Sequence, residues 1–160
     1  FDMKNYIRHL AKSSISTEEY FEIFINLKAL FKTHEDDHFP DGLENNFSIK
    51  LLAQIYEHGK LSLEIIQNFI LGNKYSDNVL CEALKWIGLI EFQATHELRF
   101  QILKESIKNK SKFVRDSAGI GFSYLGDMRA IAEVEQAIIS EKIPELKEDF
   151  ILLLEDLRIN

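Results

Sequence analysis

The clearest helical pattern in the chain runs from Val114 to Asp127 and reads Val-Arg-Asp-Ser-Ala-Gly-Ile-Gly-Phe-Ser-Tyr-Leu-Gly-Asp. Apolar or small residues recur in it at steps of four, four and three, a spacing typical of one face of an α-helix. They are Val114, Ala118, Phe122 and Leu125. Gly126 can adopt the left-handed conformation that ends a helix, and Asp127 can accept hydrogen bonds from the amides that begin the next one. The stretch therefore predicts a helical hairpin.

The same stripe recurs elsewhere in the chain. It lies 35 residues earlier as Val79, Ala83, Ile87 and Ile90, and 32 residues later as Leu146, Phe150, Leu154 and Leu157. Phe47, Leu51 and Ile55 start a degenerate earlier copy, in which His58 replaces the last apolar residue. A period of this length is typical of helical repeats.

In sequence order, a partner helix follows each of the stripes that begin at Phe47, Val79 and Val114. The apolar residues of these partner helices are spaced three then four, as Leu63, Ile66 and Ile70, then Phe100, Leu103 and Ile107, then Ile131, Val134 and Ile138. We expect Gly59 to end the helix before the first partner, Ser62 to cap that partner and Gly72 to end it. Pro144 suits the first turn of the last helix, which has no successor.

Composition limits the class of protein. The chain has 160 residues, 46% of them hydrophobic, which suits a single helical-repeat domain over residues 1–160. A net charge of −7 disfavours nucleic acid as a partner, and no stretch is apolar enough to span a membrane. The lone Cys81, predicted to be a buried structural thiol, fits a cytoplasmic location.

The first 45 residues are divergent. Tyr6, Ile7 and Leu10 suggest a short helix, and a capping box of Ser16 and Glu19 is expected to begin the next one. A polar, turn-rich loop follows over residues 33–42. We therefore divide the domain into N-terminal helices with an acidic loop over residues 1–45, and repeats ending in an unpaired helix over residues 46–160.

The repeats resemble a known family. Val114-Arg115, Ser117-Ala118 and Leu125-Gly126-Asp127 followed by Ala130-Ile131 are similar to the consensus of HEAT-like repeats. The resemblance implies an all-α fold, a short right-handed α-solenoid of antiparallel helix pairs that binds macromolecules through its second helices. Gly119 and Gly121 stand where that consensus has alanine, and each weakens a helix by about 1 kcal/mol. Close helix packing would explain both glycines, and Gly88 as well.

Enzymatic readings find little support, and we expect no catalytic residue, metal or cofactor. The cluster from His34 to His38 contains metal-ligand types, but Pro40 and Gly42 favour a solvated loop without a third inward ligand. His34-Glu35 and His96-Glu97 resemble the His-Glu pairs of deoxyhypusine hydroxylase, which occupy equivalent positions in its repeats. Here one pair is expected to follow a helix and the other to begin one, so we reject that enzyme. DNA-alkylation-repair glycosylases of this architecture need a basic concave surface, whereas this chain is acidic, so we do not favour that activity. The HEAT-like phycobilin lyases remain an open alternative.

Our leading hypothesis is a non-enzymatic module that binds another protein through stacked helices. The residues expected to line the inner surface are Glu64, Gln67, Asn68, Gln101, Lys104, Glu105, Ala132, Glu135 and Gln136. An acidic loop of Glu35, Asp36, Asp37 and Asp41 is expected to be mobile and to meet a basic partner. An alternative is an immunity protein or antitoxin that covers a basic nuclease toxin.

The last helix is apolar over more than one face. Leu146, Phe150, Leu153, Leu154 and Leu157 are expected to pack on the preceding unit, whereas Ile151, Leu152 and Ile159 point partly elsewhere. Terminal repeats normally present a polar outer face. We therefore expect this end either to contact a second copy of the protein, as a homodimer, or to lie against the next part of a longer native chain.

Overall fold

The computed structural model describes residues 16–160, and within that range the chain is all-helical, with eight α-helices, one short 3-10 turn and no strand. The elements are α2 (Thr17–Thr33), α3 (Asn46–His58), α4 (Lys60–Leu71), α5 (Asp77–Leu89), η1 (Gln93–Thr95), α6 (His96–Ser106), α7 (Lys112–Leu125), α8 (Ala130–Ser140) and α9 (Pro144–Ile159). The helix expected around Tyr6, Ile7 and Leu10 lies outside the described residues.

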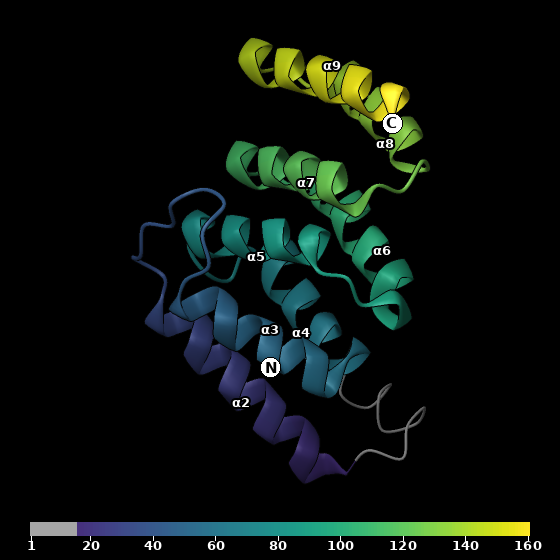
Figure 1. The fold of residues 1–160 in the computed structure, drawn as a ribbon. Helices are drawn as coiled ribbons and strands as arrows, with labels where there is room; N and C mark the ends of the chain where they lie inside the picture. Colours follow the sequence, from purple (N-terminus) through teal and green to yellow (C-terminus); the bar gives the residue numbers. More distant parts are fainter. Residues whose placement is uncertain (1–15) are drawn as a thin grey trace.

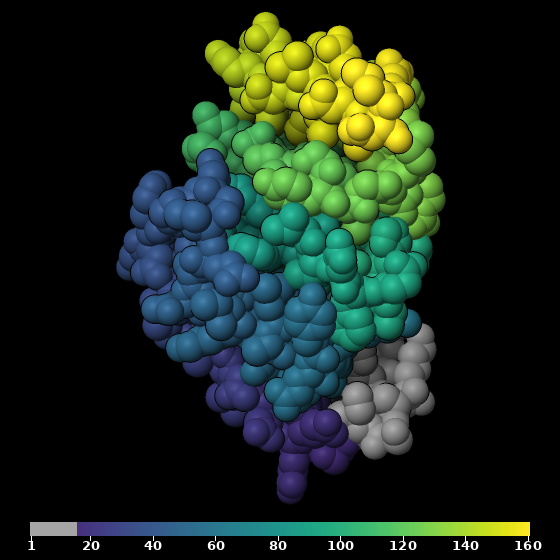
Figure 2. Space-filling model, in the orientation of Figure 1, coloured from purple at the N-terminus to yellow at the C-terminus, as the bar shows by residue number. Residues whose placement is uncertain are grey.

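The helices lie in two layers. In Figure 1, α3, α5, α7 and α9 follow one another in the nearer layer, with α4, α6 and α8 behind them. Contacts join α3 to α5, α5 to α7 and α7 to α9 in one layer, and α4 to α6 in the other. Helix α2 packs on both α3 and α4. Figure 2 shows α5, α7 and α9 along one face, with the loop of residues 34–45, in blue, lying against it.

The predicted stripes form the core. In the three complete stripes every residue is at most 8% exposed, apart from Leu125, which is half-buried. In the other layer Leu63, Ile66, Ile70, Phe100, Leu103, Ile107 and Val134 are buried, whereas Ile131 and Ile138 are only partly so. Since burying one large apolar side chain stabilises a fold by about 1.5–3 kcal/mol, these stripes supply the main driving force for packing.

The turn after α7 has part of the predicted chemistry. Gly126 adopts the left-handed conformation, with φ 68° and ψ 21°, and its amide donates to the Phe122 carbonyl oxygen. Helix α8 begins at Ala130, and the Asp127 carboxylate accepts the amide of Arg129, the residue before that helix, at 2.9 Å. The expected role of Gly126 is confirmed, whereas Asp127 bonds an amide of the turn and no side chain caps α8.

Other helix boundaries need correction. Ser62 does not cap α4, because α4 begins at Lys60 directly after Gly59, and the Ser62 hydroxyl donates to the Gly59 carbonyl oxygen at 2.7 Å. Of the capping box expected at Ser16, the structure contains the bond from the Glu19 amide at 3.2 Å. A complete capping box instead begins α3, at Asn45 and Ser48. Gly59, Gly72 and Pro144 occupy the helix ends predicted for them.

Candidate interaction surface

Two side-chain contacts join α4, α6 and α8 at the surface. The Gln67 amide on α4 donates to the Glu105 carboxylate on α6, with 3.5 Å between Nε2 and Oε2. Lys104 Nζ on α6 lies 3.3 Å from Glu133 Oε1 on α8. Three predicted residues, Gln67, Lys104 and Glu105, are therefore neighbours on a surface that crosses successive helices. We call the predicted set on α4, α6 and α8 the polar row.

Other members of the polar row face different neighbours. Glu135 accepts from Arg158 of α9 at 2.7 Å, and Gln101 donates to Glu97 of its own helix at 3.1 Å. Ala132 and Gln136 are exposed on α8, while Glu64 and Asn68 are partly buried on α4. The contacts of Gln67 with Glu105 and of Lys104 with Glu133 thus carry the row from α4 to α8, and the sequence reasoning did not include Glu133.

The acidic loop is attached to α5. The Ser76 hydroxyl donates to the backbone carbonyl oxygen of Glu35, and Lys85 Nζ lies 2.7 Å from Asp41 Oδ1. This hydrogen bond with Lys85 lowers the pKa of the Asp41 carboxyl. Phe39 packs on Phe47, with 5.5 Å between ring centroids. These contacts anchor the loop at several points, and its mobility stays a prediction.

The loop presents only part of its charge to solvent. Asp36 and Asp37 are exposed, although Asp37 also pairs with the buried His34. Glu35 is partly buried and accepts from Lys32 at 2.8 Å. Because the loop contacts α5, which lies in the layer opposite the polar row, the two predicted sets do not form a single surface.

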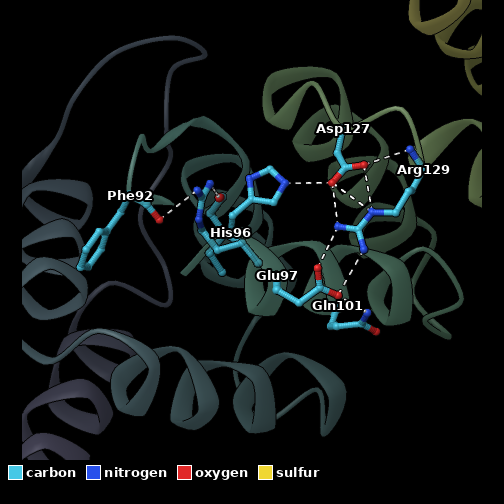
Figure 3. Close-up of polar contacts among 8 residues, drawn as sticks. Phe92, His96, Glu97, Gln101, Asp127 and Arg129 are labelled. Atoms are coloured by element: carbon cyan, nitrogen blue, oxygen red, sulfur yellow. Dashed lines mark hydrogen bonds and ion pairs between the residues drawn. The ribbon is translucent and has the colours of Figure 1, made fainter. Parts of the chain in front are cut away.

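A network of ion pairs joins the first turn of α6 to the turn before α8, and sequence reasoning missed it (Figure 3). His96 Nε2 and Arg129 Nη2 each lie 2.8 Å from Asp127 Oδ2, and Arg129 also pairs with Glu97 at 2.9 Å. The Arg129 guanidinium lies over the Phe100 ring, 4.1 Å from its centroid. Hydrogen bonds from Arg129, then His96, hold the pKa of Asp127 well below its usual range. The network links the first turn of α6 to the turn that precedes α8.

Arg99 joins α6 to the end of α5 and to the segment between these two helices. Its side chain is buried and donates to the Ile87 carbonyl oxygen at 3.1 Å, to the Thr95 hydroxyl at 3.0 Å and to the Phe92 carbonyl oxygen at 3.4 Å. Burial lowers the pKa of this guanidinium. Backbone carbonyls at the end of α5 thus find a donor, which explains a buried arginine. No local sequence pattern marks such a contact.

The chemistry of the remaining groups is limited. Burial raises the pKa of the partly buried Cys81 thiol to about 11, so the thiol is protonated near neutral pH. His34 follows α2 whereas His96 begins α6, as the sequence predicted for the two His-Glu pairs. In the described part of the chain no three His, Cys, Asp or Glu side chains gather in a way that could hold a metal. No helix within residues 16–160 has both the length and the apolar character of a membrane span.

Comparison with known protein families, with curated proteins and with solved structures finds no match to this chain.

Proposed function

We propose that this chain is a non-enzymatic interaction module, a short right-handed α-solenoid of HEAT-like antiparallel helix pairs that binds another protein in the cytoplasm. The identical internal spacing of the stripes that start at Val79, Val114 and Leu146 supports the repeat assignment, since these stripes lie along α5, α7 and α9 and are buried apart from the half-buried Leu125. The free thiol of Cys81 fits a reducing compartment.

The contacts that join α4, α6 and α8 carry the proposal. Gln67 with Glu105 and Lys104 with Glu133 bring polar groups of both charges together over three helices. A rigid helical row of this kind offers hydrogen-bond partners in fixed positions, so little ordering entropy is lost when a partner binds. Because the row carries both signs of charge, it suits the polar surface of a protein rather than a phosphate backbone.

Affinity capture tests this function directly. The tagged chain is incubated with its native extract, and the proteins that it retains are identified with and without charge reversal of the row by Glu64→Lys, Glu105→Lys and Glu135→Lys. The proposal expects a protein that the unmodified chain retains and the reversed chain loses. Equal retention by both chains would contradict it.

A basic nuclease is the second candidate partner, and a specific observation favours it. Asp116 on α7 has a raised pKa, because burial of the carboxyl and the carboxylates of Asp149 and Asp41 outweigh the opposite effect of Lys85. Acidic groups from the loop, α7 and α9 therefore gather in the layer opposite the polar row. An immunity protein would use such a surface against the cationic active site of a nuclease toxin. Capture of a basic nuclease would select this reading.

We also propose that α9 contacts a second copy of the protein. Ile151, Leu152 and Ile159 are 41%, 59% and 82% exposed, while the opposite side of the helix packs on α7 and α8. Exposed apolar groups gathered on one terminal helix favour an interface.

A further inference from the structure

Positive charge gathers where α6 ends and α7 begins, in a chain whose net charge is −7. The segment from Lys108 to Arg115 carries Lys108, Lys110, Lys112 and Arg115 and no acidic residue. Lys142 follows α8 directly after Glu141. This local excess of cations is opposite in sign to the acidic loop.

A cleft of about 510 Å³ lies between these segments. Its apolar lining comes from Ile107, Ala137 and Ile143, and its charged lining from Lys108, Arg115, Glu141 and Lys142. Pockets that bind ligands commonly enclose about 300–1,000 Å³ and combine apolar walls with a few polar groups. The cleft therefore has the size and composition of a binding site.

A partly buried ion pair builds one wall of the cleft. Arg115 donates to both carboxylate oxygens of Glu141, at 2.8 Å from Nε and 3.0 Å from Nη2, and its Nη1 donates to the backbone carbonyl oxygens of Asn109 and Lys110 at 2.9 and 3.1 Å. Glu141 also accepts the amides of Lys142 and Ile143. Both charges of the pair are thus compensated by each other, and the wall is held in place without a ligand.

The two lysines that line the cleft are not neutralised by an ion pair of this kind. Lys108 and Lys142 form no ion pair with any residue between 16 and 160, and both are exposed. After Arg115 and Glu141 offset each other, these ammonium groups leave the lining with an excess of positive charge. An anionic group entering the cleft would meet both lysines and would not have to displace an internal partner.

We propose that this cleft is a second binding site, which takes an acidic segment of a partner protein. Carboxylates of the segment pair with Lys108 and Lys142, and a neighbouring apolar side chain packs on Ile107, Ala137 and Ile143. The apolar lining distinguishes this ligand from a free inorganic anion, which would leave that surface in water. A nucleic acid is disfavoured, because its phosphate backbone would extend past the cleft over a chain of net charge −7.

Selection from a random peptide library displayed on phage, with the full chain as bait, tests the site. The enriched peptides should combine aspartate or glutamate with an adjacent apolar residue, and a synthetic copy should bind in a fluorescence-anisotropy titration. Lys108→Glu with Lys142→Glu should weaken that binding by at least about tenfold, because like charges then face each other in the cleft.

A matched control separates the cleft from overall charge. Lys28→Glu with Lys50→Glu makes the same change in net charge at exposed positions on α2 and α3, which do not line the cleft, and should leave the affinity within about twofold. Gln136 of the polar row also lines the cleft, whereas Glu64 does not. Glu64→Lys should therefore leave the affinity for the peptide unchanged, so failure here is distinguishable from failure of the proposed function. Three results would overturn the site: no acidic peptide is enriched, the Lys108 and Lys142 variant binds as well as the unmodified chain, or millimolar inorganic phosphate displaces the peptide.

Discussion

Gly88 of α5 and Gly121 of α7 lie face to face, and a β-carbon built on Gly88 would stand only 2.2 Å from the Gly121 carbonyl oxygen. A β-carbon on Gly121 would in turn meet Leu103 Cδ2 at 2.5 Å and the Leu84 carbonyl oxygen at 3.0 Å. The backbones of α5 and α7 therefore approach more closely than any side chain at these positions would permit. Close helix packing, expected from the sequence as the reason for these glycines, is confirmed.

Gly88→Ala should destabilise the fold, even though alanine favours a helix by about 1 kcal/mol. The added methyl group overlaps backbone that cannot move alone, so α5 and α7 must separate, at a net cost of about 1–3 kcal/mol. Gly119→Ala is the matched control, because its β-carbon would meet only the Phe150 and Leu153 side chains, at 3.1 Å or more. Urea unfolding measures both variants, and an equal effect of the two would refute the close approach.

Asp127 should contribute stability that disappears in acid. Because its folded pKa lies below the ordinary value of 3.8, the contribution is present above that value and is lost as the pH falls towards the folded pKa. Asp127→Asn should lower the free energy of unfolding at pH 7 and flatten its dependence on pH below about 5. Urea unfolding across the acid range checks this, with Asp36→Asn in the exposed loop as the control. If the free energy of unfolding of the Asp127 variant depended on pH as strongly as that of the unmodified chain, the ion pairs of Asp127 would not contribute to the stability of the fold.

The chain should associate with itself through α9. Ile151→Glu and Leu152→Glu would place charges in an apolar contact and strip them of water, so a dimer should dissociate. Ile25→Glu on α2, where the residue is 58% exposed, is the matched control and should leave the dimer intact. Light scattering at high micromolar concentration measures the mass. A strict monomer for the unmodified chain would exclude the homodimer.

The acidic loop should accelerate association with a basic partner. Neutralising Glu35, Asp36, Asp37 and Asp41 with Gln or Asn should slow association at low salt by several-fold and weaken its salt dependence, since charges near an interface act mainly on the encounter rate. The same number of neutralisations at exposed Glu18, Glu22, Glu91 and Glu155 is the control. Stopped-flow mixing measures the rates, and an unchanged rate at low salt would exclude the loop from binding.

Local pattern predicted most of the helices, because each stripe such as Val79 to Ile90 is decided by burial at the period of the helix itself. The same local reasoning placed the turn at Gly126 and Asp127 correctly. It was wrong at Ser62, where a single glycine, Gly59, both ends α3 and precedes α4 without a linker. Short connections leave no room for the cap that the pattern suggested.

The candidate surface was less predictable, since it depends on how each helix is rotated against the next. Gln67 and Glu105 are neighbours as expected, whereas Glu135 faces Arg158 of α9. His96 with Asp127 and Arg115 with Glu141 join residues 31 and 26 positions apart. Such pairs carry no periodic signal in one sequence, and only the packed structure reveals them.

If the polar row binds the partner, the affinity of the captured partner must depend on the charges of the row. Isothermal titration calorimetry compares the unmodified chain with the variant Glu64→Lys, Glu105→Lys and Glu135→Lys. A control variant with Glu18→Lys, Glu22→Lys and Glu91→Lys makes the same change in net charge at exposed positions outside the row. We predict that reversing the row weakens binding by at least about tenfold while the control stays within about twofold. An affinity that the row variant leaves unchanged would contradict the account.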